Sequence, residues 1–296
     1  MTQPQQQQPV FFSPAQMKQI SYNRPPELID GLLPAQGVAV LAGAPGTGKS
    51  FTALSWAAAV AEGKDWFGRK TNQTAVAYVL GEGFSSFGSR VEAWEKVNGR
   101  PMSEAVYFMH GLNSGVDLKD SDSVEQLIQQ LMHVWPGLII FDTFSVLARI
   151  NNENDNAEIA VVMANIHKIV EATGATALLI HHVTKSTGSV RGAGAFVGNA
   201  DTVVIAAPNR NNELKGDFFL STLASDGGKR RDGEAKAFYG FSIESPGVLT
   251  RNGGTSTATT TAPTSLDPNE IIAVARMAHE RQKDQENNED NEDQEN

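Results

Sequence analysis

The chain has 296 residues, a formal net charge of −10 and no cysteine. This length predicts one large domain or two small ones, and the missing cysteines exclude disulfide scaffolds, cysteine-bound zinc, iron–sulfur clusters and thiol nucleophiles. The longest apolar runs, residues 56–61 and 175–180, are too short to cross a bilayer, and the N-terminus shows no secretion signal. We therefore expect a cytoplasmic protein that has no membrane partner.

The negative charge is concentrated at the C-terminal end. Residues 284–296 contain seven acids and no base, which leaves the rest of the chain at −3. A nearly neutral body can carry local basic loops, so the acidic total does not exclude nucleic acid as a partner. Composition predicts four regions: a flexible Gln- and Pro-rich arm (1–25), a folded core (26–248), a Gly/Thr linker (249–268), and a short helix with a disordered acidic tail (269–296).

Within the core, apolar runs alternate with helical stretches. The runs that predict strands span residues 38–42, 74–80, 105–109, 138–141 and 175–180. The stretches between them that predict helices span residues 50–62, 86–97, 123–133 and 157–172. Such alternation is typical of a parallel sheet covered on both faces. Three later runs, 202–206, 218–223 and 237–243, lack helices between them. The sequence therefore predicts an α/β fold with a mostly parallel central sheet and an antiparallel C-terminal edge.

A glycine-rich motif joins the first predicted strand to the first helix of the core. Residues 43–50, GAPGTGKS, fit the pattern G-x-x-x-x-G-K-[ST]. Glycines let backbone N–H groups converge on phosphate oxygens, and the helix N-terminus adds its dipole. We expect Lys49 to reach the β- and γ-phosphates and the Ser50 hydroxyl to coordinate Mg²⁺. The predicted nucleotide-binding residues are Gly43, Ala44, Pro45, Gly46, Thr47, Gly48, Lys49, Ser50 and Thr52.

Polar residues also end three other predicted strands. Asp142 follows four apolar residues and suits a carboxylate beside the metal, the Walker B position. Glu82 can orient and deprotonate an attacking water, or it is a solvated turn residue. His181 and His182 face opposite ways, so one of them can sense the γ-phosphate, or neither has a role. Because the carboxyl ends of parallel strands share one edge, we expect Lys49, Glu82, Asp142 and His182 to converge.

Three polar segments are candidates for contacts outside this site. Residues 149–158 are rich in Asn, and residues 184–199 carry Lys185, Arg191 and four glycines. A loop with two bases and little bulk can follow a phosphate backbone, although an ordinary surface loop has the same composition. The bases at 229–231 form either a solvated turn or an arginine finger that reaches a neighbour's γ-phosphate.

Together these motifs resemble the RecA-like P-loop ATPases, and most closely the RepA-like hexameric replicative DNA helicases of plasmids and phages. The resemblance spans residues 29–241. It rests on six segments that follow one another along the chain: LAGAPGTGKS, AVAYVLGEG, LIIFDT, ALLIHHVTK, SVRGAGAFVGNAD and GGKRRDGE. It implies ATP bound between adjacent subunits of a ring, with Lys49 and Ser50 as the Walker A pair. It further implies that Glu82 is the catalytic carboxylate, Asp142 the Walker B residue and His182 the γ-phosphate sensor.

The same resemblance implies roles for four basic residues. Lys185 and Arg191 would face DNA in the pore, while Lys229 and Arg231 would occupy the place of the family's K-x-R pair. The chain departs from the family in having no primase or helicase collar domain before the core, and in its Gln-rich start and acidic tail.

The expected function is therefore that of an ATP-hydrolysing, ring-forming helicase or translocase on single-stranded DNA in replication. The implied partners are single-stranded DNA and further copies of the chain, as a hexameric ring. Two alternatives stay open: a RecA-like recombinase or recombination mediator that forms filaments on DNA, and an oligomeric ATPase switch that does not bind DNA. The acidic tail is either a docking segment for replication partners or a solubilising end.

Overall fold

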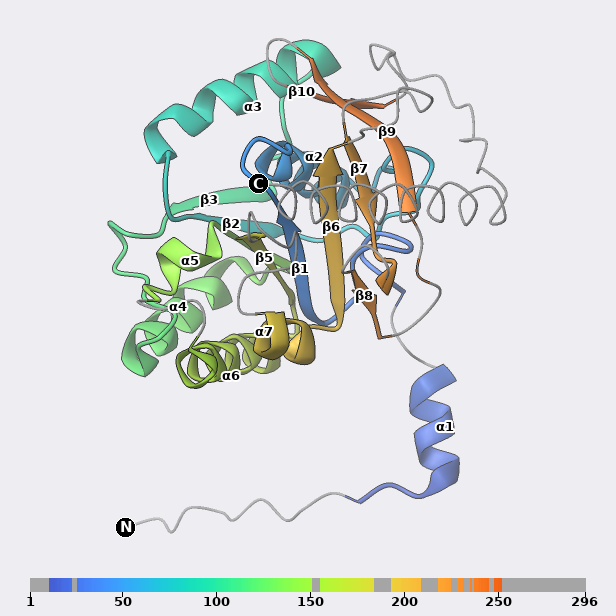
Figure 1. The fold of residues 1–296 in the computed structure, drawn as a ribbon, viewed down its shortest axis with the longest axis vertical. Coiled ribbons are helices and arrows are strands. Elements are labelled where there is room, and N and C mark those ends of the chain that lie inside the picture. Colours follow the sequence, from blue (N-terminus) through green and yellow to red (C-terminus); the bar gives the residue numbers. More distant parts are fainter. Residues whose placement is uncertain are drawn as a thin grey trace, which may run out of the picture.

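One mixed sheet runs through the body of the protein (Figure 1). The computed structural model describes residues 11–22, 26–150, 155–183, 193–208, 218–224, 228–231, 235, 237–244 and 248–251. The strands are β1 (Gly37–Gly43), β2 (Val76–Leu80), β3 (Val106–His110), β4 (Leu138–Asp142), β5 (Thr176–His182), β6 (Thr202–Pro208), β7 (Phe218–Ser221), β8 (Lys229–Arg230), β9 (Ala237–Glu244) and β10 (Val248–Arg251). Their order is β10-β9-β7-β6-β1-β5-β4-β2-β3, and β8 pairs with β6.

The centre of the sheet is parallel and the C-terminal edge is antiparallel. Strands β6, β1, β5, β4, β2 and β3 pair in parallel, whereas β7, β8, β9 and β10 pair antiparallel. All residues of β2 and β4 are buried, as expected for apolar strands covered on both faces. The predicted α/β fold is confirmed.

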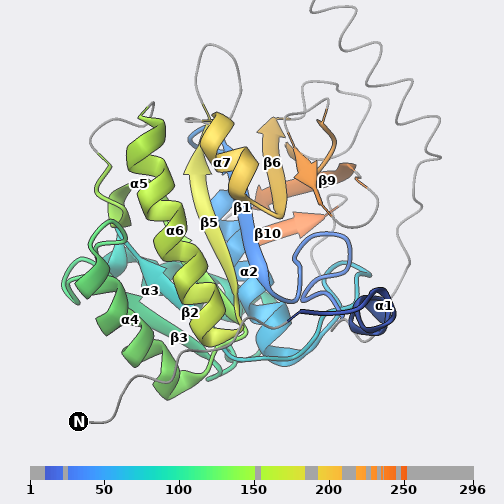
Figure 2. The same ribbon diagram turned by 90° about the horizontal axis from the view of Figure 1, so that it is seen from below.

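Helices cover both faces of this sheet. The helices are α1 (Pro14–Tyr22), α2 (Lys49–Glu62), α3 (Phe84–Asn98), α4 (Ser121–Val134), α5 (Phe144–Leu147), α6 (Asn156–Thr173) and α7 (Ala193–Asn199). One apolar core includes residues of α2 and α3, and the other includes residues of α4, α5, α6 and α7. Figure 2 shows α2 and α6 on opposite sides of β1 and β5. No helix in the described part of the chain is long and apolar enough to span a membrane.

Three elements differ from the prediction. β6 was expected at the antiparallel edge, but it pairs in parallel with β1, because the short helix α7 precedes it and supplies the crossover. β10 occupies residues 248–251, where the linker was expected to begin, and pairs antiparallel with β9. Residues 14–22, expected within a flexible arm, form α1. The rest of the predicted linker, the helix after it and the acidic tail lie outside the described residues.

Candidate functional site

The glycine-rich motif forms the turn between β1 and α2. Gly46 and Gly48 have φ of +82° and +73°, a left-handed conformation that side chains with a Cβ rarely adopt. Gly43 lies against the neighbouring strand, since a Cβ on it would come 2.3 Å from the Ala206 carbonyl oxygen. Gly48 occupies the N-cap of α2, and no side chain of the described residues caps the helix there. The turn therefore leaves the helix N-terminus to an anionic ligand.

Lys49 lies buried at the first position of α2. Its Nζ donates hydrogen bonds to the carbonyl oxygens of Gly43, at 2.9 Å, and Ala44, at 2.8 Å. Burial lowers the pKa of Lys49 to about 8, and the charge of Asp142 opposes that shift. The ammonium is thus held inside the turn by neutral carbonyls, which a phosphate can replace with a stronger, charged partner.

We predict from this lowered pKa that ATP binding takes up a proton at alkaline pH. The free ammonium loses its proton as pH rises through about 8. A bound triphosphate raises the pKa again, because opposite charge favours the protonated form. Affinity should therefore fall above pH 8, and uptake should approach one proton per ATP near pH 9. Titration calorimetry in buffers of different ionisation enthalpy measures the number of protons taken up per ATP. A proton uptake that does not rise between pH 7.5 and 9 would contradict this prediction.

Asp142 ends β4 and points into a polar network. The Tyr78 hydroxyl, from the neighbouring β2, donates a hydrogen bond of 2.8 Å to Asp142 Oδ2. Ser50 also hydrogen-bonds this carboxylate. Burial raises the pKa of Asp142, while the bonds from Tyr78 and Ser50 oppose the rise. The same burial, with the Asp142 charge, raises the pKa of Tyr78.

The Ser50 hydroxyl and the Asp142 carboxylate are hard oxygen donors, which suits Mg²⁺. Among the residues that the structure describes, no three His, Cys, Asp or Glu side chains gather as a complete metal site. Mg²⁺ usually keeps one or two protein ligands and takes the rest from phosphates and water, so Ser50 and Asp142 are the residues that would hold it.

A cavity of about 250 Å³ opens beside these groups and is lined by Ser50, Glu82, Asp142 and Arg90 among others. Glu82 is exposed in it, and the Thr143 hydroxyl donates a 3.4 Å hydrogen bond to Glu82 Oε1. The charge of Glu82 also acts on Asp142. The structure thus brings Lys49, Ser50, Glu82 and Asp142 together at one end of the parallel strands.

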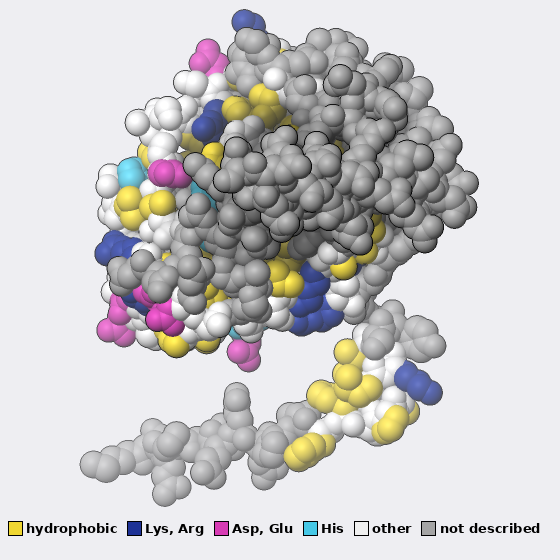
Figure 3. Space-filling view, viewed as in Figure 1, with side chains coloured by type: hydrophobic (Ala, Val, Ile, Leu, Met, Phe, Trp, Pro, Cys, Tyr) yellow, Lys and Arg dark blue, Asp and Glu magenta, His cyan; other side chains and the backbone are white. Residues whose placement is uncertain are grey.

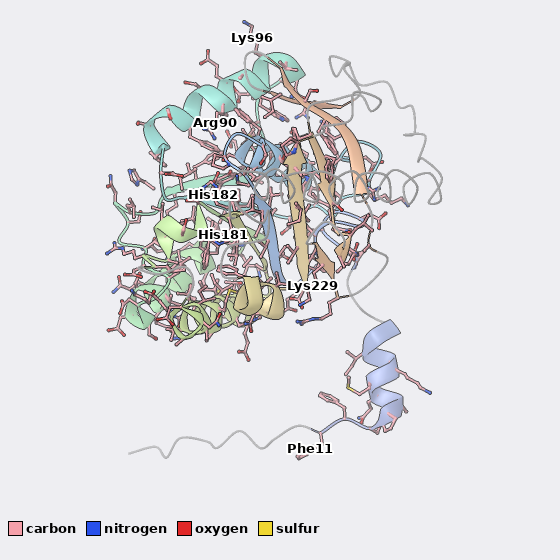
Figure 4. All side chains as sticks on the ribbon, viewed as in Figure 1. Phe11, Arg90, Lys96, His181, His182 and Lys229 are labelled. Atoms are coloured by element: carbon pink, nitrogen blue, oxygen red, sulfur yellow. The ribbon has the colours of Figure 1, made fainter. Side chains whose placement is uncertain are left out.

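Arg90 is a residue of this cavity that the sequence analysis missed. It reaches the cavity from α3, with its guanidinium 5.0 Å from the ring centre of Phe51 and 5.2 Å from that of Phe87 (Figure 4). The two rings hold the cation in place. No local motif marks Arg90, and only its three-residue spacing from the buried Phe87 on one helix face could have indicated it.

A second cavity of about 250 Å³ lies on the other side of the turn. It is lined by residues 44–47 together with Pro208, Phe218 and Ile243. A Cβ on Gly48 would come 2.6 Å from Ile243 Cδ1, so the antiparallel edge packs directly on the turn. Strands β6, β7 and β9 thereby supply an apolar wall that no sequence motif had indicated.

The two histidines of β5 occupy different environments. His181 is fully buried; its ring stacks on Phe196 of α7, at 4.7 Å, and meets Phe144 edge-on, at 5.8 Å. His182 is half-buried and pairs in register with Gly43, the first residue of the turn. His182 is therefore the histidine placed beside the nucleotide motif, and His181 is a core residue.

The basic cluster at residues 229–231 lies away from the cavity that Ser50, Glu82 and Asp142 line. Lys229 Nζ donates to the carbonyl oxygens of Val197, at 2.5 Å, and Gly198, at 3.1 Å, and burial lowers its pKa. Arg231 pairs with Asp201 at 2.5 Å. Asp201 also accepts a bond from the Val38 N–H at the start of β1, whereas the glycine-rich turn follows the end of that strand. Lys229 and Arg231 thus lie at the opposite end of the sheet from their own chain's cavity.

Three further residues were predicted to belong to the site: Thr52, Lys185 and Arg191. Thr52 is fully buried in α2, and its Oγ1 has no hydrogen-bond partner in the described part of the chain. Lys185 and Arg191 lie outside the described residues, as do residues 151–154 of the other polar segment.

Comparison with known proteins identifies the family of this chain. Residues 4–188, more than half of the chain, match the family described as the AAA domain. A KaiC-like protein from the hyperthermophilic archaeon Pyrococcus horikoshii OT3 is similar, with 17% identity and a TM-score of 0.46, over 75% of this chain and 93% of that one. The search of curated proteins gave no match. The chain belongs to the AAA domain family and is a P-loop ATPase.

Proposed function

We propose that the protein is an ATP-driven motor on single-stranded DNA, a ring-forming helicase or translocase of the RepA-like kind. The observation that carries the DNA part is the position of the two described flanks of residues 184–192, the stretch of sequence that contains Lys185 and Arg191. This segment follows Val183, whose N–H bonds to the Gly43 carbonyl oxygen at 3.4 Å. It leads into α7, whose Phe196 stacks on His181. One flank is thus bonded to Gly43, where β1 enters the nucleotide turn, and the other packs on β5, the strand that pairs with β1.

In this proposal the triphosphate lies along the glycine-rich turn. Lys49 exchanges its carbonyl partners for phosphate oxygens, and Arg90 stabilises the negative charge that develops during cleavage. Glu82 positions a water and accepts its proton. When bound at Ser50 and Asp142, Mg²⁺ would neutralise phosphate charge. The cavity walled by Pro208, Phe218 and Ile243 suits the base and ribose, because it is apolar and adjoins the same turn.

His182 would link hydrolysis to movement on DNA. Its strand position pairs with Gly43, and the segment with Lys185 and Arg191 starts two residues later. Loss of the γ-phosphate would alter the contacts of the imidazole, and the basic segment would shift along the phosphate backbone.

The test is the ATPase rate with and without single-stranded oligo-dT, over a series of salt concentrations. We expect DNA to raise the rate severalfold and the stimulation to fall as salt increases. A Lys185→Ala, Arg191→Ala double variant should need at least about tenfold more DNA for half-maximal stimulation, since each lost phosphate contact weakens binding. Lys96→Ala, on the far end of α3, is the matched control (Figure 4).

The outcome also separates the alternatives. An ATPase that DNA does not stimulate would contradict the motor and favour the oligomeric switch. Stimulation without unwinding, but with strand exchange on extended filaments, would favour the recombinase.

A further inference from the structure

Tyr78 brings a hydroxyl group into the apolar interior of the sheet. Its side chain is fully buried, and its ring centre lies 5.0 Å from that of Phe87 on α3 and 5.7 Å from that of Phe108 on β3. A phenylalanine would make the same ring contacts. A buried hydroxyl costs free energy unless it has a hydrogen-bond partner. The packing therefore explains the ring of Tyr78 but not its oxygen atom.

The partner of this hydroxyl is the Asp142 carboxylate on the neighbouring strand β4. The register pairs Tyr78 with Ile140 and Leu80 with Asp142, so Asp142 lies two residues further along the parallel strands than Tyr78. Two residues of a strand rise about 6.6 Å, close to the reach of a tyrosine side chain. The Tyr78 hydroxyl spans this rise and donates to Asp142 Oδ2 at 2.8 Å. Phenylalanine has the same ring without the donor at its tip.

Tyr78 contacts Asp142 from outside the nucleotide cavity. Ser50 and Asp142 line that cavity, whereas Tyr78 is fully buried and does not. Ser50 also hydrogen-bonds the carboxylate, but its hydroxyl is one of the two groups that would hold Mg²⁺. Tyr78 is thus a partner of Asp142 whose hydrogen bond does not compete with the metal.

The hydroxyl fixes the carboxylate without adding an opposing charge. A phenol is a neutral donor, so the negative charge of Asp142 stays available to attract a cation. A lysine or arginine at the same place would orient the carboxylate but would also cancel that charge. In metal sites, carboxylate ligands are commonly oriented by hydrogen bonds from residues that do not touch the metal.

We propose that Tyr78 is a positioning residue for the magnesium site, and that its hydroxyl keeps the Asp142 carboxylate in the orientation in which Asp142 and Ser50 would hold Mg²⁺. The proton stays on the tyrosine oxygen, and Tyr78 acts through Asp142 rather than on the metal. Loss of such an outer hydrogen bond typically lowers metal affinity or activity by about 10- to 100-fold. The inference concerns the metal site of the ATPase and does not depend on the DNA part of the proposed function.

Three variants of the full chain separate the hydroxyl from the packing. Tyr78→Phe removes one oxygen atom and keeps the ring. Because Tyr78 is fully buried, this change leaves the charged and hydrophobic side chains of the surface as they are (Figure 3), so contacts with DNA or other copies cannot account for its effect. Tyr107→Phe, the same chemical change at an exposed residue of β3, is the matched control. Phe108→Leu removes a ring that packs on Tyr78 but keeps the hydroxyl, so it is the packing control.

The affinity for Mn²⁺, used as the probe for the metal, gives the outcome. Electron paramagnetic resonance measures free Mn²⁺ during a titration of each protein with a non-hydrolysable ATP analogue, and the protein is in excess so that no free nucleotide binds the metal. We expect the Kd for Mn²⁺ to rise at least about tenfold in Tyr78→Phe. The Kd of the analogue in EDTA should stay within about twofold of wild type, because Tyr78 does not line the cavity.

Both controls should keep the Kd for Mn²⁺ close to that of wild type, although Phe108→Leu should lower the melting temperature because it leaves a gap beside Tyr78. An unchanged Mn²⁺ affinity in Tyr78→Phe would overturn the proposal. An equal loss of Mn²⁺ affinity in Phe108→Leu, or an equal loss of metal-free nucleotide affinity in Tyr78→Phe, would also overturn it, because either result assigns the effect to packing. The response of the ATPase to DNA tests the proposed function separately from all of these results.

Discussion

Replacing Glu82 with glutamine is expected to lower kcat for ATP hydrolysis by about 100- to 10,000-fold, the usual contribution of a general base. Glutamine keeps the size of the side chain and can still bond to the Thr143 hydroxyl, but it cannot accept a proton from water. Glu82 is exposed in the cavity and contributes no described contact to the core, so ATP affinity and folding should change little. Single-turnover hydrolysis and binding of a fluorescent ATP analogue measure the two effects separately.

Glu92→Gln is the matched control for this variant. Glu92 is an exposed glutamate on α3 and does not line the cavity. Its replacement should leave kcat within about twofold of wild type, as for most exposed substitutions. If Glu82→Gln also retained kcat within that range, water activation would have to be assigned to another group.

Lys49→Ala is expected to reduce hydrolysis by at least about 100-fold and to weaken ATP binding as well. The ammonium lies in the turn and donates hydrogen bonds to the carbonyl oxygens of Gly43 and Ala44. Loss of one preorganised positive group at a transferring phosphate typically lowers kcat by about 100- to 1,000-fold. Steady-state phosphate release and calorimetric titration with ATP measure both losses.

The fold should survive this substitution. Burial lowers the pKa of Lys49 to about 8, which means that keeping the ammonium protonated at neutral pH opposes folding. We therefore expect the melting temperature of Lys49→Ala to stay within a few degrees of wild type. Lys64→Ala, an exposed lysine just after the other end of α2, is the control and should keep full activity. Full ATPase activity in Lys49→Ala would refute the assignment of the turn as the nucleotide site.

The sequence was most informative where function depends on local backbone geometry. The turn at 43–50 needs glycines in fixed positions and a following helix, so its pattern identified it without tertiary information. The positions of Glu82, Asp142 and His182 at one sheet edge followed from parallel topology, because each ends an apolar run. Even the opposite facing of His181 and His182 follows from strand periodicity alone.

Residues that act through tertiary packing left no such signal. Arg90 enters the cavity because Phe51 and Phe87, from two different helices, hold its guanidinium. Tyr78 was one apolar residue within a strand run, and only the pairing of β2 with β4 places its hydroxyl on Asp142. The pairing partner of β6 was likewise missed, because α7 is too short and glycine-rich to show helical periodicity.

The structure of the protein with Mg²⁺ and a non-hydrolysable ATP analogue tests the central claim most directly. The account predicts the triphosphate on the turn at residues 43–50, with the γ-phosphate in the cavity shared by Glu82, Arg90 and Asp142. It also predicts that Lys49 Nζ leaves the carbonyl oxygens of Gly43 and Ala44 for phosphate oxygens. A nucleotide bound elsewhere, or a γ-phosphate remote from Glu82 with Lys49 still on those carbonyls, would contradict it.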